Sequence, residues 1–392
     1  MISRSPVTDA EMERRWALTR TALQSAGLDA VLVHGTNDWL GGHVRWLTDI
    51  PATNGYPRSV IFYAHRPMSV IEMGAFGSAR DLGGSDKVQR GVGRWRGTPS
   101  FSAVGQTNGY DAALVLTELR HAGVRALGVV TPGALPHAMM AALKAQADLR
   151  VVDATDLIDT IKAVKSAEEI GLIRRTAALQ DQVWAEVLDY IRPGLTDINI
   201  ANHAQAVAHR LGSDQGIFLG LSARMGQSAR FAGRQMQGRT LAKRDHFSLL
   251  IEVNGPGGLY LEIARTVTMG AASDAVLAGF VAVKAAQEHS LSLIRPGAAP
   301  AAIAAAHDAY MQAQGLPPET RLYAHGQGLD MVERPLIRAD ETLPLQAGMC
   351  LAVHPGFDDG TVFAVICDNY MVVEGGVSDC LHQTAKQVFE LV

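Results

Sequence analysis

The stretch from Asp245 to Gly270 constrains the fold more than any other part of this chain, because it reads as a β-hairpin. An apolar run over 247–253 is followed by the turn sequence Asn-Gly-Pro-Gly-Gly and by a second apolar run over 259–269. Two apolar runs joined by a short glycine-rich turn are typical of antiparallel strands. The sequence therefore predicts a buried hairpin in the second half of the chain.

Each predicted strand of this hairpin carries one carboxylate, Glu252 in the first and Glu262 in the second. A single Glu in a strand usually faces solvent. An ionised carboxylate buried among Leu, Ile and Val instead needs a cation, a hydrogen-bond donor or a metal. Two such groups across one hairpin favour a functional site.

Length, charge and cysteine content exclude several classes of protein. The 392 residues are enough for two or three domains. With 35 basic and 39 acidic residues and no block of like charge, neither nucleic acid nor a membrane surface is indicated as a partner. No run approaches the ~18 apolar residues of a membrane span, and the first residues are charged where a signal peptide is apolar, so we expect a cytoplasmic protein. The three cysteines lack C-x-x-C spacing, which argues against a disulfide framework or a zinc knuckle.

The first 160 residues alternate between helical and strand-like patterns. Helical patterns cover 9–27, 110–122 and 136–147, and strand-like runs cover 28–35, 59–64, 68–73, 126–130 and 149–154. This alternation predicts a smaller α/β domain. The phosphate-binding patterns GxGxxG and GxxxxGK[ST] are both absent, so no nucleotide site is supported.

The second half begins with a helix signal and then repeats itself. Ser166 and Glu169 form a capping-box pattern, which predicts a long helix ending near residue 190. The segments 191–212 and 294–315 align without a gap, share the letters IRPG and end in glycine. Chance similarity between Ala-rich helices would explain part of this match, but the shared register favours a duplicated α+β unit. Such a duplication places a cleft between two halves, where ligands commonly bind.

Three further positions carry chemical groups in apolar surroundings. His325 lies in Tyr-Ala-His-Gly-Gln-Gly, His354 follows the apolar run 351–353, and Cys367 and Asp368 interrupt the apolar run 363–373, which we expect to form one strand. Each also has a structural explanation: a satisfied histidine, a small core thiol or a loop-capping carboxylate.

Taken in order, these segments resemble one family. KSAEEI before a long helix, ARTVTMG, AHGQGLD, VHPG and ICDNYMVVEGG follow one another as in the creatinase, prolidase, aminopeptidase P and methionine aminopeptidase (M24-type) superfamily. The resemblance implies an α/β N-terminal domain over 1–160 and an internally duplicated α+β pita-bread catalytic domain over 161–392. In the first domain, VRWLTDI (44–50) looks like a strand of that family. The resemblance also implies a homodimer whose partner borders the site.

The resemblance assigns the family's metal-ligand positions to residues of different types. Its peptidases hold two divalent ions with two Asp, one His and two Glu, and these positions fall on Glu252, Glu262, His325, His354 and Cys367. Asp368 matches the Asp after the last ligand, and Arg265 stands three residues after Glu262 as in the family motif; both are candidate substrate-binding groups. The family's proton-handling histidines are missing, since one position falls near Ala232 and the other on Val332.

The altered ligand set can still bind metal, but with different preferences. It is richer in nitrogen and sulfur than the family's carboxylate bridge. Loss of both bridging glutamates favours one Zn²⁺ or Fe²⁺, or no metal at all, over a dinuclear centre.

The leading functional hypothesis is a creatinase-like hydrolase that cleaves a C–N bond in a small polar substrate of guanidino, amide or dipeptide-like type. His325 or His354 would transfer protons, and Glu252 and Glu262 would hold a cationic or amide-bearing group. Cys367 would serve as a thiolate nucleophile, a ligand or a core residue. The alternatives are an Xaa-Pro-type metallopeptidase with altered ligands, a lyase acting on a small sulfonium or betaine compound, and an inactive binding module.

Overall fold

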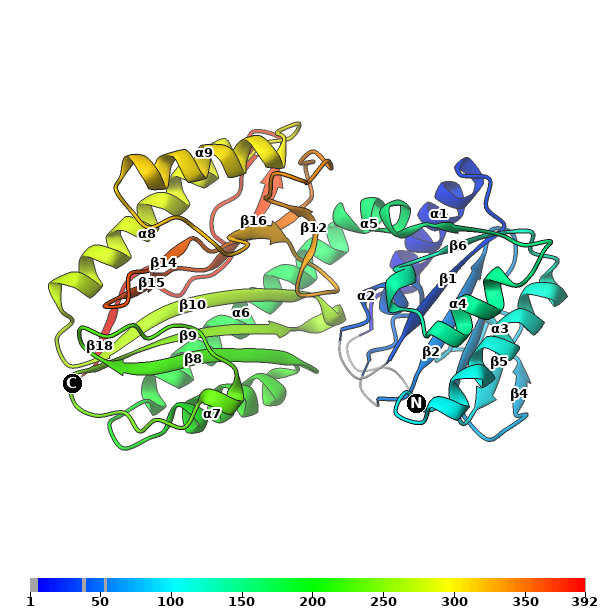
Figure 1. Cartoon of the computed structure of the whole chain (residues 1–392), viewed down its shortest axis with the longest axis horizontal. Coiled ribbons are helices and arrows are strands. Elements are labelled where there is room, and N and C mark those ends of the chain that lie inside the picture. Colours follow the sequence, from blue (N-terminus) through cyan, green and yellow to red (C-terminus); the bar gives the residue numbers. More distant parts are fainter. Residues whose placement is uncertain (1–5, 37–39, 53–54, 392) are drawn as a thin grey trace. The chain divides into compact units, whose positions relative to one another are not determined.

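The computed structural model describes residues 6–36, 40–52 and 55–391. The chain forms two compact units, Met1–Lys162 and Ala163–Val392, and each is described by itself (Figure 1).

The first unit is built on one mixed sheet with the strand order β4-β5-β3-β2-β1-β6-β7. Its strands are β1 (Ala30–Gly35), β2 (Arg58–Tyr63), β3 (Met68–Met73), β4 (Ala79–Asp81), β5 (Val92–Thr98), β6 (Ala126–Val129) and β7 (Arg150–Asp153). Its helices are α1 (Asp9–Ser25), α2 (Gly42–Thr48), α3 (Asn108–Ala122), α4 (His137–Lys144) and α5 (Thr155–Ala163). Apolar residues of α3 and α4 pack against β1, β2, β3 and β6 and form one core cluster of this unit.

The strand expected at 44–50 is wrong, because those residues lie mainly in α2. Gly41 and Asp49, which flank this short helix, both have positive φ angles of 96° and 56°, so the chain turns sharply at each end. Strands β4 and β5 had no strand-like signal in their Gly- and Arg-rich sequence. Gly97 accounts for part of the missing strand signal in β5. A Cβ at position 97 would lie 2.8 Å from the Trp95 ring and 3.1 Å from the Gly74 backbone, so this strand requires glycine there.

The second unit contains two larger sheets, each covered by a pair of helices (Figure 1). The helices are α6 (Ala167–Tyr190), α7 (Asp197–Leu211), α8 (Asp274–Leu293) and α9 (Pro300–Ala313). One sheet has the order β18-β10-β9-β8, and the other has the order β12-β11-β13-β16-β17. The strands are β8 (Gly216–Arg224), β9 (Asp245–Asn254), β10 (Tyr260–Met269), β11 (Ala324–Gly326), β12 (Glu333–Leu336), β13 (Cys350–Val353), β14 (Gly356–Asp358), β15 (Phe363–Val365), β16 (Asp368–Val373), β17 (Gly376–Val377) and β18 (Phe389–Leu391).

The predicted hairpin is confirmed as β9 and β10, which pair antiparallel from Tyr260 opposite Asn254 to Thr268 opposite His246. Every residue of both strands is buried, which explains the continuous apolar pattern. Gly257 in the connecting turn has φ 71°, a conformation that favours glycine. The register places Glu262 directly opposite Glu252.

The predicted helix start at Ser166 is also confirmed, since α6 begins with a complete capping box and ends at Tyr190. The two similar segments fold alike: each contributes a helix, α7 or α9, after a long helix, α6 or α8. Gly212 and Gly315, which follow these helices, have φ angles of 115° and 66°. Apolar residues of α6 and α7 pack on β8, β9 and β10.

The apolar run 363–373 is two strands rather than the single strand expected. It breaks after Val365, and Cys367 forms an isolated bridge with Ala264 of β10. This bridge brings the second sheet into contact with the hairpin. Among the described residues no helix is long and apolar enough to cross a membrane.

Candidate functional site

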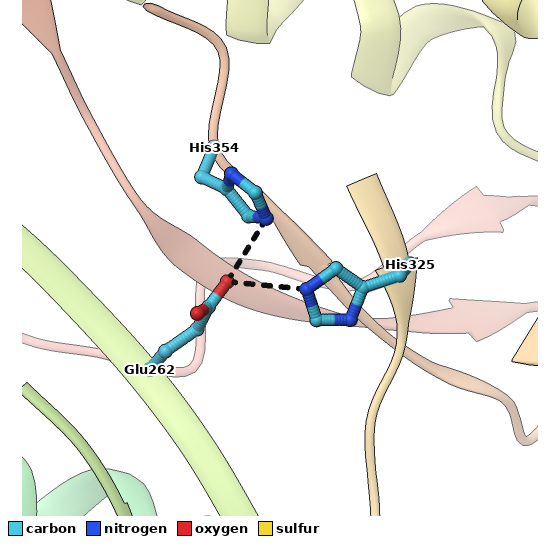
Figure 2. Close-up of side chains that lie close together, drawn as sticks. All are labelled: Glu262, His325 and His354. Atoms are coloured by element: carbon cyan, nitrogen blue, oxygen red, sulfur yellow. Dashed lines mark ion pairs between the residues drawn. The ribbon is translucent and has the colours of Figure 1, made fainter. Parts of the chain in front are cut away.

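Three of the expected residues meet at one point, from three different strands or strand ends. Glu262 comes from β10, His325 from β11, and His354 directly follows β13. Figure 2 shows their polar ends converging on the Glu262 carboxylate. The Oε1 atom of Glu262 lies 3.3 Å from Nε2 of His354 and 3.7 Å from Nε2 of His325. One ligand atom from each residue lies within 4.8 Å of the other two.

Both imidazoles present a ring nitrogen to Glu262. The Nδ1 atom of His325 lies 2.9 Å from the carbonyl oxygen of Gly326 and therefore donates to it, which leaves Nε2 as the ring nitrogen that faces Glu262. Burial lowers the pKa of His354 to about 4, although the neighbouring Glu262 opposes this effect. His354 is therefore neutral near pH 7, in the form that can coordinate a metal.

Two polar atoms of this cluster lack the partners that burial demands. Oε1 of Glu262 and Nε2 of His354 are both buried and have no hydrogen-bond partner among the described residues. Unpaired buried polar atoms are rare in folded proteins, and each costs about 1–3 kcal/mol. Because both atoms belong to one cluster of three potential ligands, a single bound cation would satisfy them together.

Glu252 faces the cluster but has a different environment. Its Oε1 accepts a hydrogen bond of 2.8 Å from Nε2 of Gln327. Burial, and then the charge of Glu262, raise the pKa of Glu252 well above its usual value. The side chain of Asn369 completes this arrangement, because it donates to Gln327 (2.7 Å) and accepts from the backbone N–H of Glu262 (2.8 Å).

Sequence reasoning missed Gln327 and Asn369. Both side chains are completely buried. The sequence did contain a signal for each: Gln327 is an amide in a glycine-rich segment beside His325, and Asn369 is an amide in an apolar run directly after Cys367 and Asp368. A buried amide needs partners at both of its ends, so its position indicates a polar network nearby.

Cys367 does not join the cluster, contrary to two of its three expected roles. Its thiol is fully buried and points to the backbone carbonyl of Glu262, with Sγ 3.6 Å from that oxygen. It packs with Leu250 and Ala264. Burial, and then Glu262, raise the pKa of this thiol well above its usual value, so the thiolate that a nucleophile or ligand requires is disfavoured. The geometry is that of a core residue.

Arg265 and Asp368 are also misassigned as substrate-binding groups. Both side chains are fully buried and form an ion pair of 2.7 Å. Arg265 also donates to the backbone carbonyls of Ala264, Cys367, Thr384 and Ala385. No donor remains to face a substrate, and the pair instead fastens β16 to β10.

A second group of potential ligands, Asp368, Cys380 and His382, lies on the other side of Asp368. Two cations already occupy the carboxylate, since Arg265 is paired with Oδ1 and Lys386 lies 3.5 Å from Oδ2. A metal ion would be repelled by these neighbours. This group is structural.

Comparison with known proteins identifies the family of the second unit. Residues 171–374, just over half of the chain, match the model of Metallopeptidase family M24. The chain belongs to this metallopeptidase family. The expected superfamily and pita-bread fold are thereby confirmed, and the solved structures agree with them.

Relatives in the M24 family are named as peptidases. The chain is 27% identical over 240 residues to "Probable dipeptidase PepE" of Mycobacterium tuberculosis, which covers 59% of this chain and 62% of that protein. The dipeptidase PepE of Mycobacterium ulcerans has a similar structure, with a TM-score of 0.76, 22% identity and coverage of 98% of this chain and 99% of that one. The prolidase of Thermococcus sibiricus gives a TM-score of 0.78 at 17% identity, with coverage of 98% and 100%. At these identities, the structural comparisons show the fold.

A single divalent metal fits the three-residue cluster of this M24 member. Ligand distances of about 2.0–2.2 Å to Zn²⁺ place two tetrahedral ligand atoms about 3.4 Å apart. The 3.3 and 3.7 Å separations agree with this spacing, and a cation would satisfy both unpaired atoms. Two His and one Glu are also a known set for catalytic zinc.

Proposed function

We propose that this chain hydrolyses the C–N bond of an amide in a small, dipeptide-like substrate, with one divalent metal held by Glu262, His325 and His354. The observation that carries the proposal is the convergence of these three side chains, in which Oε1 of Glu262 and Nε2 of His354 are buried, lie 3.3 Å apart and have no hydrogen-bond partner among the described residues. The names of the relatives, which include dipeptidases and prolidases, support an amide substrate over a guanidino compound.

The surroundings of Glu252 favour one metal over two. In the family arrangement Glu252 would bind a second ion, but here the amide of Gln327 donates to its carboxylate. Asn369 donates a hydrogen bond to that amide. A second ion would therefore have to displace the buried side chain of Gln327, which is held by two hydrogen bonds. Cys367, the remaining ligand of a second ion, points elsewhere.

The protein groups divide the chemical work between them. When bound, the metal supplies Lewis acidity to a carbonyl group. Glu252 is the group that we assign to proton transfer, because it faces Glu262 across the hairpin and its second oxygen is not engaged by any described residue. It would replace the family histidines, whose positions fall near Ala232 and on Val332.

The proposal is tested by measuring metal content and dipeptide hydrolysis on the same preparations. Protein purified without chelator should contain about one equivalent of divalent metal and should lose hydrolysis on chelation. His354→Ala should lose both metal and activity. Cys367→Ala should keep the metal and most of the activity, and His209→Ala, at an exposed helix end, is the matched control.

Other results would contradict the proposal in distinct ways. Metal-free protein that still cleaves amides or guanidino compounds would indicate creatinase-type chemistry without metal. Two equivalents would restore the dinuclear peptidase. Loss of metal in Cys367→Ala would make that thiol a ligand, and full metal occupancy without turnover of any amide would point to a lyase or a binding module.

A further inference from the structure

A pocket of about 900 Å³ lies in the first unit, between the start of α1, the residues that follow α2 and the loop before β5. Its apolar wall includes Trp16, Ile50 and Val88. The Trp16 ring is fixed in place, because its Nε1 donates to the carbonyl oxygen of Leu47 (2.8 Å) and a Cβ on Gly91 would lie only 2.6 Å from the ring. Pockets for small ligands span about 300–1,000 Å³, so this one has room for a small molecule.

Two buried acceptor atoms of the lining have no donor. Asp49 is only 2% exposed. Its Oδ2 accepts from the N–H of Val7 (3.1 Å) and from Nη2 of Arg90 (2.5 Å), but its Oδ1 has no hydrogen-bond partner among the described residues. Oε1 of Gln89, also in the lining, is buried and lacks a partner in the same part of the chain. Buried polar atoms are normally paired, so a ligand of this pocket should bring hydrogen-bond donors.

The charges of the lining favour a cationic ligand. Four carboxylates and two cations line the pocket, which gives an excess of two negative charges: Asp9, Glu13, Asp49, Asp86, Lys87 and Arg90. Arg90 is committed, because its guanidinium contacts both Asp9 (2.9 Å) and Asp49 (2.5 Å). Glu13 is exposed and has no hydrogen bond or ion pair with any residue in the described ranges. Its carboxylate remains available to a ligand.

The environment of Asp49 also leaves its carboxylate short of stabilisation. Burial raises the pKa of Asp49, although the nearby Arg45, Arg90 and Arg15 oppose this effect. Arg15 is itself paired with Glu11 (2.8 Å). A bound cation with N–H donors would supply the stabilisation that these arginines do not complete.

We propose that this pocket binds a small organic amine, with its ammonium group at Asp49 and Glu13 and its apolar body against Trp16. An ammonium group has three N–H donors and no acceptor, which matches a lining with unpaired acceptors. Indole rings also attract cations. The inference is independent of the proposed hydrolysis, because every residue that carries it belongs to the first unit and none to the catalytic cluster.

Calorimetric titration of the full chain should compare phenethylamine with phenethyl alcohol, which differ in an ammonium group against a hydroxyl group. We expect the amine to bind at least about 10-fold more tightly, because hydrogen bonds between charged groups are the stronger ones. Asp49→Asn keeps an oxygen for Val7 and Arg90 but removes the charge, and should reduce this preference to less than about 2-fold. Glu13→Gln should reduce it by about 2–3-fold. Glu374→Gln, at an exposed turn of the second unit, should leave it unchanged.

Methyl NMR locates the binding site without any substitution. In the full chain with labelled isoleucine methyl groups, phenethylamine should shift the signal of Ile50, which lines the pocket. The signal of Ile303, buried in the second unit, should not move. This measurement and Glu13→Gln decide the matter if Asp49→Asn fails to fold.

Equal binding of the amine and the alcohol, an unchanged preference in folded Asp49→Asn, or an Ile50 signal that the amine does not move would each overturn the assignment. Competition between the amine and a dipeptide substrate, with Ile50 unmoved, would place the amine at the catalytic cluster and overturn it as well. Amine binding with a shifted Ile50 signal in a protein that hydrolyses no dipeptide would support the pocket and contradict the proposed function alone.

Discussion

Gln327 lies between the Glu252 carboxylate and the Asn369 amide, and it bonds to both. Its uncharged side chain therefore does two things at once: it fixes one oxygen of Glu252, and it keeps Asn369 oriented toward the backbone of Glu262. Groups that orient the residues of a metal site typically change activity or affinity 10–100-fold when they are lost. We therefore treat Gln327 as a positioning residue.

Replacing Gln327 with Leu should test this role. The variant loses both hydrogen bonds and leaves a buried amide of Asn369 unpaired, which should lower the free energy of unfolding by about 1–3 kcal/mol. We expect kcat for dipeptides to fall 10–100-fold. The metal content should stay near one equivalent, because the ligand atoms of Glu262 and of both histidines are unaltered. Activity equal to the parent would show that Glu252 needs no such support.

At the same scale, the sequence identified the chemical groups better than their roles. Glu262, His325 and His354 were expected from residue type and order, and the structure brings them together. Cys367 and Arg265 were assigned to chemistry by position in a motif, but their roles depend on side-chain direction. A bridge between Ala264 and Cys367 directs the thiol toward a carbonyl, and no pattern in the sequence encodes that contact.

Helix α6 illustrates how local sequence determines an element. The hydroxyl of Ser166 accepts from the N–H of Glu169 (3.1 Å), and the Glu169 carboxylate accepts from the N–H of Ser166 (2.9 Å). These two bonds satisfy amides that a helix start leaves free. Because all the atoms involved lie within four residues, this start was predictable from sequence.

Ser166→Ala should lower the free energy of unfolding of the second unit by about 1 kcal/mol, the usual cost of losing a capping hydroxyl. Denaturant titration followed by far-UV circular dichroism is the measurement. Ser273→Ala at the start of α8 is the comparison, since Ser273 makes one longer bond of 3.4 Å to the N–H of Val276. If Ser166→Ala lowers the free energy of unfolding no more than Ser273→Ala does, the two reciprocal hydrogen bonds at Ser166 contribute no extra stability and the prediction is wrong.

Elements fixed by distant contacts were harder to predict. The hairpin was readable because its apolar strands and turn are adjacent in sequence, whereas residues 44–50 were taken for a strand only because they resemble a strand of the family, and they fold mainly as α2. Strand β5 depends on glycine at position 97, where the Trp95 ring comes close. Such contacts exist only after folding.

Across the whole molecule, buried histidines make stability depend on pH. Burial lowers the pKa of His34 in the first unit and of His307 in the second to about 4. In the unfolded chain histidine titrates near 6.5. The unfolded state therefore binds more protons between these values, so stability is full above pH 6.5 and falls as the pH drops toward 4.

His307 gives the sharper test, because it is fully buried and bonded to Ser290 (2.9 Å) while its ring stacks on Tyr323. Because His307 takes up a proton less readily in the folded state than in the unfolded state, the free energy of unfolding of the second unit should be about 2 kcal/mol lower at pH 5 than at pH 7. Between pH 7 and pH 5, the free energy of unfolding of the variant His307→Gln should fall by about 2 kcal/mol less than that of the parent. Unfolding titrations at pH 7 and pH 5 give the comparison, and equal losses in both proteins would rule out His307 as a source of the dependence.

The position of β18 has a consequence for biosynthesis. Strand β10, which carries Glu262, has β9 on one side and β18 on the other, and Arg265 bonds to a carbonyl 120 residues further along the chain. At translation rates of about 5–20 residues per second, the ribosome needs roughly 6–24 s to make those residues. During that time the nascent hairpin has one unpaired edge, which is a template for aggregation. The strand at the centre of the candidate site therefore keeps an edge open to misassembly until the end of the chain has been made.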